Sequence, residues 1–80
     1  MKTKTLYYVV DVHVGDTVDV EVLYGPYKDE RRAVKAVYDY YDTYFKDDED
    51  VVMDAMAAKI EMDEGDCTRT ILVARRYSLE

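Results

Sequence analysis

Polar and apolar residues alternate with a period of two through the first part of the chain, on both sides of Gly15-Asp16-Thr17. The apolar positions are Tyr8, Val10, Val12 and Val14, then Val18, Val20, Val22 and Tyr24. Such alternation of β-branched residues is typical of strands, and the intervening glycine indicates a hairpin turn. A three-residue loop pairs Val14 with Val18 and keeps the valines on one face, whereas a two-residue loop would mix core and solvent positions. The pattern therefore predicts a hairpin whose valines face the core.

A helix is expected after this hairpin. Gly25-Pro26 ends the second strand, and Asp29 is suited to cap the helix that follows. At about 100° per residue, the apolar side chains of this segment fall within an arc of roughly 160°. The residues in the arc are Ala33, Val34, Val37, Tyr38, Tyr40, Tyr41, Tyr44 and Phe45. The segment is therefore predicted to be an amphipathic helix that covers one face of a sheet.

The stretch 49–63 admits two interpretations. Its Ala, Met, Lys and Glu residues favour helix, but its second half alternates apolar and polar residues as a strand does. We expect one or two helical turns over about 49–57 and a strand over about 58–63. A final strand is expected over about 68–77.

The turn between the last two strands, Gly65-Asp66-Cys67, repeats the chemistry of the first turn. The same three-residue loop would pair Ile60 with Leu72, and it would place Asp63 opposite Arg69 as an opposite-charge pair. The elements together predict an α+β fold. It is a four-stranded antiparallel sheet in the order ββαββ, hairpin–helix–hairpin, with the helix packed on one face, and residues 1–80 form a single compact domain.

The net charge of −7 comes from one segment. Between Lys46 and Asp66 there are nine acids and two bases, and the rest of the chain is balanced. An acidic balance argues against direct nucleic-acid binding, which needs Lys and Arg. No apolar run approaches the roughly 20 residues that span a bilayer, so we expect no membrane association. The single Cys67 excludes an internal disulfide and suits a reducing cytoplasm, where we expect the protein to reside.

The sheet face that the helix leaves uncovered is the first place to look for a function. In the register above it carries Leu23, Ile71, Val73, Arg69, Arg75 and His13. A mixture of apolar and charged side chains resembles a contact surface, although Ile71 and Val73 would also stiffen a strand that arginine stems shield. We therefore expect a small non-enzymatic domain that binds a protein partner through this face, either another protein or a second copy in a homodimer.

Four residues on the same face are candidate metal ligands. They are Asp11, His13, Asp19 and Glu21. One imidazole and three carboxylates suit a divalent cation, and two acids on paired strands repel each other unless something neutralises them. The simpler interpretation is a solvated face neutralised by Arg75 or Lys59. We therefore expect neither a metal nor a cofactor.

The acidic residues suggest an alternative function. They are Asp47, Asp48, Glu49 and Asp50 in one run, and Asp63, Glu64 and Asp66 near the second turn. Spaced carboxylates can mimic the phosphates of DNA toward a basic DNA- or RNA-binding protein, as in some small phage-encoded inhibitors. The simpler interpretation is an acidic surface that is only solvated.

No catalytic motif is recognisable. The chain has one His, one Cys and no glycine-rich phosphate loop. His13 and Cys67 would form a nucleophile pair only if the two hairpin tips met, and the sequence pattern gives no reason for that. We expect the protein not to be an enzyme.

Overall fold

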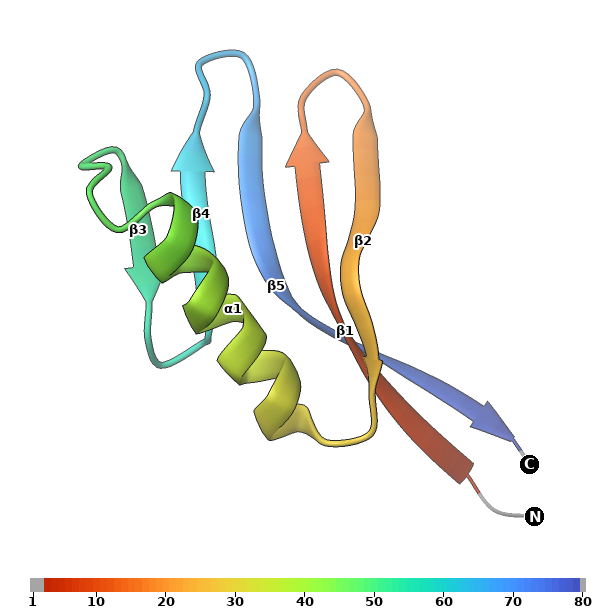
Figure 1. Cartoon of the computed structure of the whole chain (residues 1–80). Coiled ribbons are helices and arrows are strands. Elements are labelled where there is room, and N and C mark those ends of the chain that lie inside the picture. Colours follow the sequence, from red (N-terminus) through yellow and green to blue (C-terminus); the bar gives the residue numbers. More distant parts are fainter. Residues whose placement is uncertain (1–2, 80) are drawn as a thin grey trace.

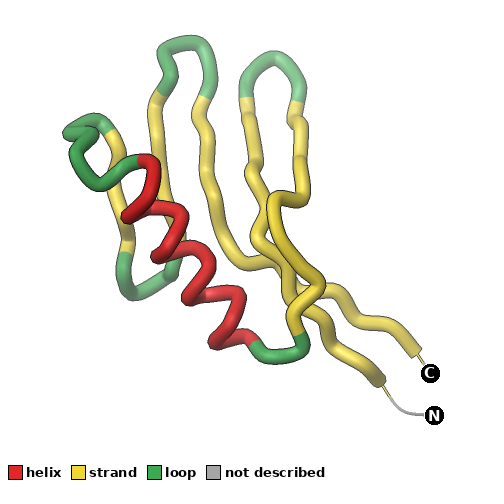
Figure 2. Tube along the Cα trace, viewed as in Figure 1, coloured by secondary structure: helices red, strands yellow, loops and turns green. Residues whose placement is uncertain are grey.

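The structure, a computed structural model, describes residues 3–79 as a five-stranded antiparallel sheet with one helix across one of its faces (Figure 1, Figure 2). The elements are β1 (Thr3–Val14), β2 (Val18–Tyr27), α1 (Glu30–Tyr44), β3 (Val51–Asp54), β4 (Lys59–Asp63) and β5 (Thr68–Leu79). The strand order is β2-β1-β5-β4-β3, so the first and last strands are neighbours. The α+β class, the antiparallel sheet and the helix on one face are confirmed. The predicted ββαββ order is wrong, because three strands follow the helix.

The first hairpin has the predicted register. Val14 pairs with Val18, and the same register continues along β1 as far as Val10. The backbone N–H of Gly15 donates a hydrogen bond to the carbonyl of Thr17 at 3.0 Å within the three-residue loop. The alternation of valines therefore identified both the strands and their pairing correctly.

β2 departs from this regular pairing beyond Val22, where a bulge shifts the register. Beyond the shift, Leu23 packs against the core and Tyr24 contacts the ring of a helix tyrosine, so both lie on the helix side. Gly25 follows with φ +125°, and a Cβ at this position would come within 2.8 Å of the Tyr8 ring. Only glycine fits there. The bulge thus supplies apolar side chains to the helix side of β2.

The helix α1 begins where the sequence predicted. The side chain of Asp29 accepts a hydrogen bond from the Arg31 N–H at 2.9 Å and caps the first turn. Ala33 and Val37 are fully buried, and the helix ends at Tyr44. The predicted amphipathic helix is confirmed.

Residues 51–54 form an edge strand, so the helical turns predicted over about 49–57 are wrong there. β3 pairs with β4 along its length, with Val51 opposite Met62. Val51 is buried in the core, and this tertiary contact outweighs the helical preference of the local residues. The following strand, β4, agrees within a residue with the strand predicted over about 58–63.

The second hairpin turns over four residues rather than three. Its last pair is Asp63 with Thr68, so the loop is residues 64–67, within which the Glu64 N–H donates to the carbonyl of Cys67 at 2.9 Å. Gly65 has φ +86°, a conformation that favours glycine in tight turns. The two turns share Gly-Asp but differ in length by one residue.

The longer loop moves the register of β4 against β5 by one residue. Ile60 lies opposite Ile71 instead of Leu72, and Asp63 lies opposite Thr68 instead of Arg69. Because side chains alternate along a strand, this slip exchanges the two faces of β5. The pairs predicted for this hairpin are therefore wrong.

This register decides which face the helix covers. The buried core cluster consists of Val9, Ala33, Val37, Val51, Ile60, Met62 and Ile71. Val9 belongs to it, so the alternating valines that follow on β1 point to the opposite side of the sheet. The helix therefore covers the face opposite to the predicted one, and the valines of the first hairpin lie on the face without a helix.

We expect Ile71→Ala to lower the free energy of unfolding by about 2–5 kcal/mol, because the side chain is fully buried and its loss leaves a cavity. The matched variant Val52→Ala alters a side chain that is 58% exposed, and it should change stability by less than about 0.5 kcal/mol. Urea unfolding followed by circular dichroism measures both variants. An equally small effect of both would mean that Ile71 does not lie beneath the helix.

Candidate functional site

The sheet face without a helix carries a continuous apolar surface, hereafter the valine face. Its residues are Val10, Val12 and Val14 of β1, Val18, Val20 and Val22 of β2, and Leu72 of β5. They are neighbours across three strands, since Val10 pairs with Val22 on one side and Leu72 on the other. Val18, Val20 and Val22 are 65%, 62% and 57% exposed, whereas Val12 and Leu72 are half-buried and Val10, between them, is buried at 7%. A contiguous exposed apolar surface of this kind marks an interaction site more often than plain solvent exposure.

The charged residues of the first hairpin are kept off the valine face. Asp11, Asp19 and Glu21 alternate with the valines, so they point to the helix side. On the far side of β5, the valine face is bordered by β4, where Lys59 Nζ lies 2.9 Å from Glu61 Oε1. β1 and β2 thus separate their residues into one apolar and one acidic face.

A charge cluster around Asp11 lies on the helix side. Asp11 is only 3% exposed, and both of its carboxylate oxygens accept hydrogen bonds from Arg69 Nε, at 2.8 and 3.0 Å. His13 Nε2 lies 3.2 Å from Asp11 Oδ1, and the Arg69 guanidinium lies 5.8 Å from the centre of the Phe45 ring. The hydrogen bond to Asp11 raises the pKa of Arg69 above its ordinary value. The arginine therefore stays charged and compensates the buried carboxylate.

The residues predicted to bind a partner do not lie on the uncovered face, so that placement is wrong. They are Leu23, Ile71, Val73, Arg69, Arg75 and His13. Ile71 is fully buried, and Leu23 and Val73 pack against the core. His13 and Arg69 belong to the charge cluster around Asp11, and Arg75 is exposed further along β5. The error comes from the register of β4 against β5. Ile60 pairs with Ile71 rather than Leu72, so the core residues of β4 lie on the face opposite to the valines of the first hairpin.

The candidate metal ligands do not come together as a metal site. Arg69 occupies both oxygens of Asp11, and Asp19 and Glu21 are exposed. Within residues 3–79, no group of three or more His, Cys, Asp or Glu side chains is placed to hold a metal ion. Arg69, which was not predicted for this role, neutralises Asp11 of β1.

Two acidic segments that are separate in the sequence meet at one end of the sheet. Asp48 and Asp50, from the loop after α1, line a hollow of about 290 Å³ together with Asp63 and Glu64 of the second hairpin. All four are exposed. The remaining predicted members of the acidic surface, Asp47, Glu49 and Asp66, are exposed as well. The sequence identified the acids, but only the fold places the two segments together.

The two hairpin tips lie side by side, contrary to expectation, because β1 pairs with β5. A Cβ on Gly15 would lie 3.2 Å from the Cβ of Cys67. The Cys67 thiol nevertheless contacts Glu64 Oε2 at 3.8 Å, whereas His13 contacts Asp11. Burial raises the pKa of the Cys67 thiol, and nearby carboxylates, Glu64 foremost, raise it further. A thiol with a raised pKa is a weak nucleophile near neutral pH.

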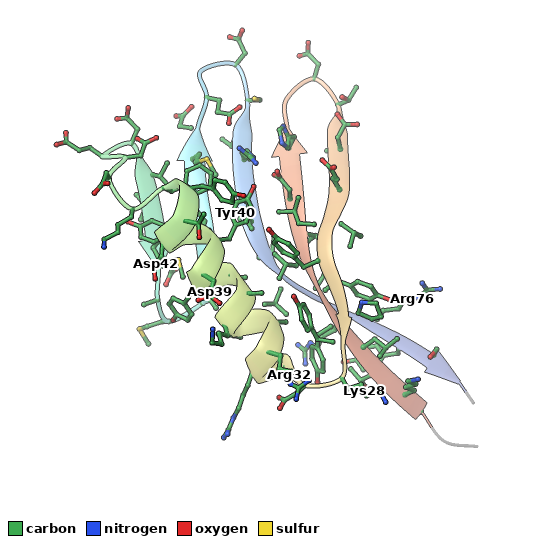
Figure 3. All side chains as sticks on the ribbon, in the orientation of Figure 1. Lys28, Arg32, Asp39, Tyr40, Asp42 and Arg76 are labelled. Atoms are coloured by element: carbon green, nitrogen blue, oxygen red, sulfur yellow. The ribbon has the colours of Figure 1, made fainter. Side chains whose placement is uncertain are left out.

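An aromatic hollow of about 250 Å³ lies between α1 and β2. It is lined by Tyr24, Tyr27, Ala36, Asp39, Tyr40, Thr43 and Tyr44. The ring of Tyr40, on α1 (Figure 3), lies 4.7 Å from that of Tyr44 and 6.0 Å from that of Tyr24. Sequence reasoning missed this hollow, and its only signal there is the unusual number of tyrosines, nine in 80 residues.

Charge is divided between the two ends of the molecule. The hairpin tips and the loop after α1 lie at one end, which we define as the acidic end, residues 47–50 and 63–66 (Figure 1). Lys28, Arg32 and Arg76 lie toward the other end, where the chain termini are, and these three define the basic end (Figure 3). The long axis of the molecule, 46 Å, separates the two.

Comparison with protein-family models, curated proteins and solved structures finds no match to this chain. In the part of the chain that the structure describes, no helix is long and apolar enough to cross a membrane. The function therefore has to be inferred from the geometry and chemistry of the surfaces described above.

We expect Asp11→Asn to lower the free energy of unfolding by roughly 1–3 kcal/mol, because it leaves the largely buried Arg69 without its charged partner. Asp39→Asn is the matched control. It breaks the Lys35–Asp39 pair, whose side chains are 75% and 61% exposed, and should cost less than about 0.5 kcal/mol. Chemical denaturation measures both variants. Equal losses of stability would show that the Asp11–Arg69 pair contributes no more than the exposed Lys35–Asp39 pair.

Proposed function

We propose that the protein is a small non-enzymatic interaction domain that binds a protein partner through the valine face. The observation that carries this proposal is the exposure of Val18, Val20 and Val22 within one continuous apolar surface on the side opposite the helix. The proposal keeps the predicted mode of binding, through the open face of the sheet. It assigns that role to the valines instead of the residues around Ile71.

The energetics of this surface favour association. Fully burying a valine contributes about 1.5 kcal/mol, so three valines that are more than half exposed offer several kcal/mol to a partner that covers them. β-Branched side chains on a strand are already restricted in χ1 and lose little rotamer freedom on binding. The valine face is therefore preorganised for an apolar contact.

The shape and charge of the surface favour a protein partner. Small-molecule sites are concave, whereas the valine face is the surface of a sheet, and the tyrosine-lined hollow lies on the helix side. A net charge of −7 opposes binding to nucleic acid. A flat apolar surface with polar borders is typical of protein–protein interfaces.

We expect Val20→Asp to reduce the amount of partner captured by the immobilised protein from a lysate of its own cells at least tenfold, because a buried unpaired carboxylate opposes association. Thr43→Asp adds the same charge on the exposed side of α1 and should leave capture unchanged. Quantitative mass spectrometry of the captured proteins measures the difference. Equal capture by both variants would rule out the valine face as the binding surface.

A second function, an acidic mimic of nucleic acid toward a basic DNA- or RNA-binding protein, is favoured by one observation. Acids from two segments line the same hollow at the acidic end, so the carboxylates form a shared surface rather than two isolated loops. Such a surface attracts a basic channel through many exposed charges. This candidate ranks second because solvated acidic loops are common.

This second function predicts that Asp48→Asn with Asp50→Asn abolishes displacement of a fluorescent DNA duplex from a basic DNA-binding protein of the same cells. Asp39→Asn with Asp42→Asn removes the same charge from α1 (Figure 3) and should preserve displacement. Raising NaCl from about 50 to 300 mM should weaken displacement at least tenfold, since exposed charges are screened. Displacement that is insensitive to salt would contradict charge mimicry.

A further inference from the structure

We infer that the occupant of the valine face is a second copy of this chain, stacked face to face about a two-fold axis that runs across the strands. This inference rests on the proposed function and adds the identity and orientation of the partner. Such an axis keeps β5 over β5 but reverses strand direction, so the acidic end of each copy lies beside the basic end of the other.

The placement of charge makes this self-contact favourable. Two copies of a protein with a net charge of −7 repel each other in most orientations. The first hairpin adds no acid to the valine face because Asp11, Asp19 and Glu21 point to the helix side, and the acids on the valine side are those of β4, Glu61 and Asp63. The reversed orientation adds attraction, since Arg76 lies at the basic end and the hairpin tips are acidic.

The strand register specifies one ion pair across this contact. Arg76 and Thr68 share a face with Leu72 and lie four residues on either side of it along β5, about 13 Å each way at 3.3 Å per residue. A two-fold axis crossing at Leu72 therefore brings Arg76 of one copy over Thr68 of the other. Asp63 pairs with Thr68 on the neighbouring strand and lies on the same face, about 4.8 Å away. Its Oδ1 accepts a hydrogen bond from the Gly65 N–H at 3.0 Å, which leaves Oδ2 for the arginine. The contact would contain this Arg76–Asp63 pair twice.

The uncovered side of the whole sheet is close in size to one side of a standard interface. Its five strands have 43 residues at about 3.3 Å each, spaced about 4.8 Å apart, and give roughly 700 Å², of which the valine face on β1, β2 and β5 is a part. Side-chain relief makes the accessible area larger, which brings it near the about 800 Å² that each partner contributes to a standard interface. Stacked sheets of this kind pack about 10 Å apart with nearly aligned strands.

Sedimentation velocity and native mass spectrometry of the full chain test this inference. The wild-type protein should form a dimer at about 50 mM NaCl, and Val20→Asp should raise the dissociation constant at least about 100-fold. Val18→Asp serves as a second variant, and Thr43→Asp on α1 is the control that should remain dimeric. Circular dichroism establishes that each variant is folded, as expected for side chains that are mostly exposed.

A charge exchange tests the orientation. Arg76→Glu or Asp63→Lys alone should weaken the homodimer at least about tenfold at low salt, because each creates two repulsive pairs. Mixing the two variants should restore a heterodimer, because the mixed contact contains one native and one exchanged attractive pair. A dimer lost on Val20→Asp but not restored by mixing would overturn the orientation.

Two further outcomes separate this inference from the proposed function. A wild-type protein that stays monomeric at about 100 μM, far above the nM affinities of standard interfaces, would overturn self-association. The valine face would then still have to pass the capture experiment with Val20→Asp. A dimer that persists in Val20→Asp and Val18→Asp would overturn this inference, because the copies would then meet through another surface, and the capture experiment would still decide the proposed function.

Discussion

The rest of the structure depends on the pairing of Ile60 with Ile71 across β4 and β5. Both side chains are fully buried, and together they direct the apolar residues of the C-terminal strands toward the helix. A four-residue loop, residues 64–67, sets this pairing, and the three-residue loop Gly65-Asp66-Cys67 would pair Ile60 with Leu72 instead. Because β5 also pairs with β1, this choice extends to the N-terminal hairpin and leaves its valines uncovered.

The two faces of the sheet differ in chemistry: the helix side contains a buried ion pair, and the other side carries apolar residues that no helix covers. On the helix side, the buried carboxylate of Asp11 is acceptable because Arg69 binds both of its oxygens and ties β1 to β5. On the other side, no helix covers the valines, and water contact with them is unfavourable. The separation of charge from the apolar surface gives the molecule an interaction face, and the acidic and basic ends orient whatever it binds.

Local patterns correctly predicted the elements in which hydrophobic periodicity and the turn or capping residues indicate the same structure. The first hairpin follows from strict alternation around Gly15, and the helix follows from its apolar arc and the cap at Asp29. Prediction was wrong at residues 51–54, where Met53 and the Ala and Met residues that follow at 55–58 favour helix but pairing with β4 makes a strand. It was also wrong at Gly65, because Gly-Asp is compatible with loops of three or four residues.

The sequence by itself determined the α+β class, the register of the first hairpin, the start of the helix and the acidity of one segment. These properties depend on side-chain periodicity, glycine and proline positions and charge, which act over a few residues. Only the tertiary structure decided which sheet face the helix covers, and therefore that the valines are exposed and Ile71 is buried. It also brought the two acidic segments together. These outcomes depend on the register between strands far apart in the chain, and in that register a shift of one residue reverses every side chain.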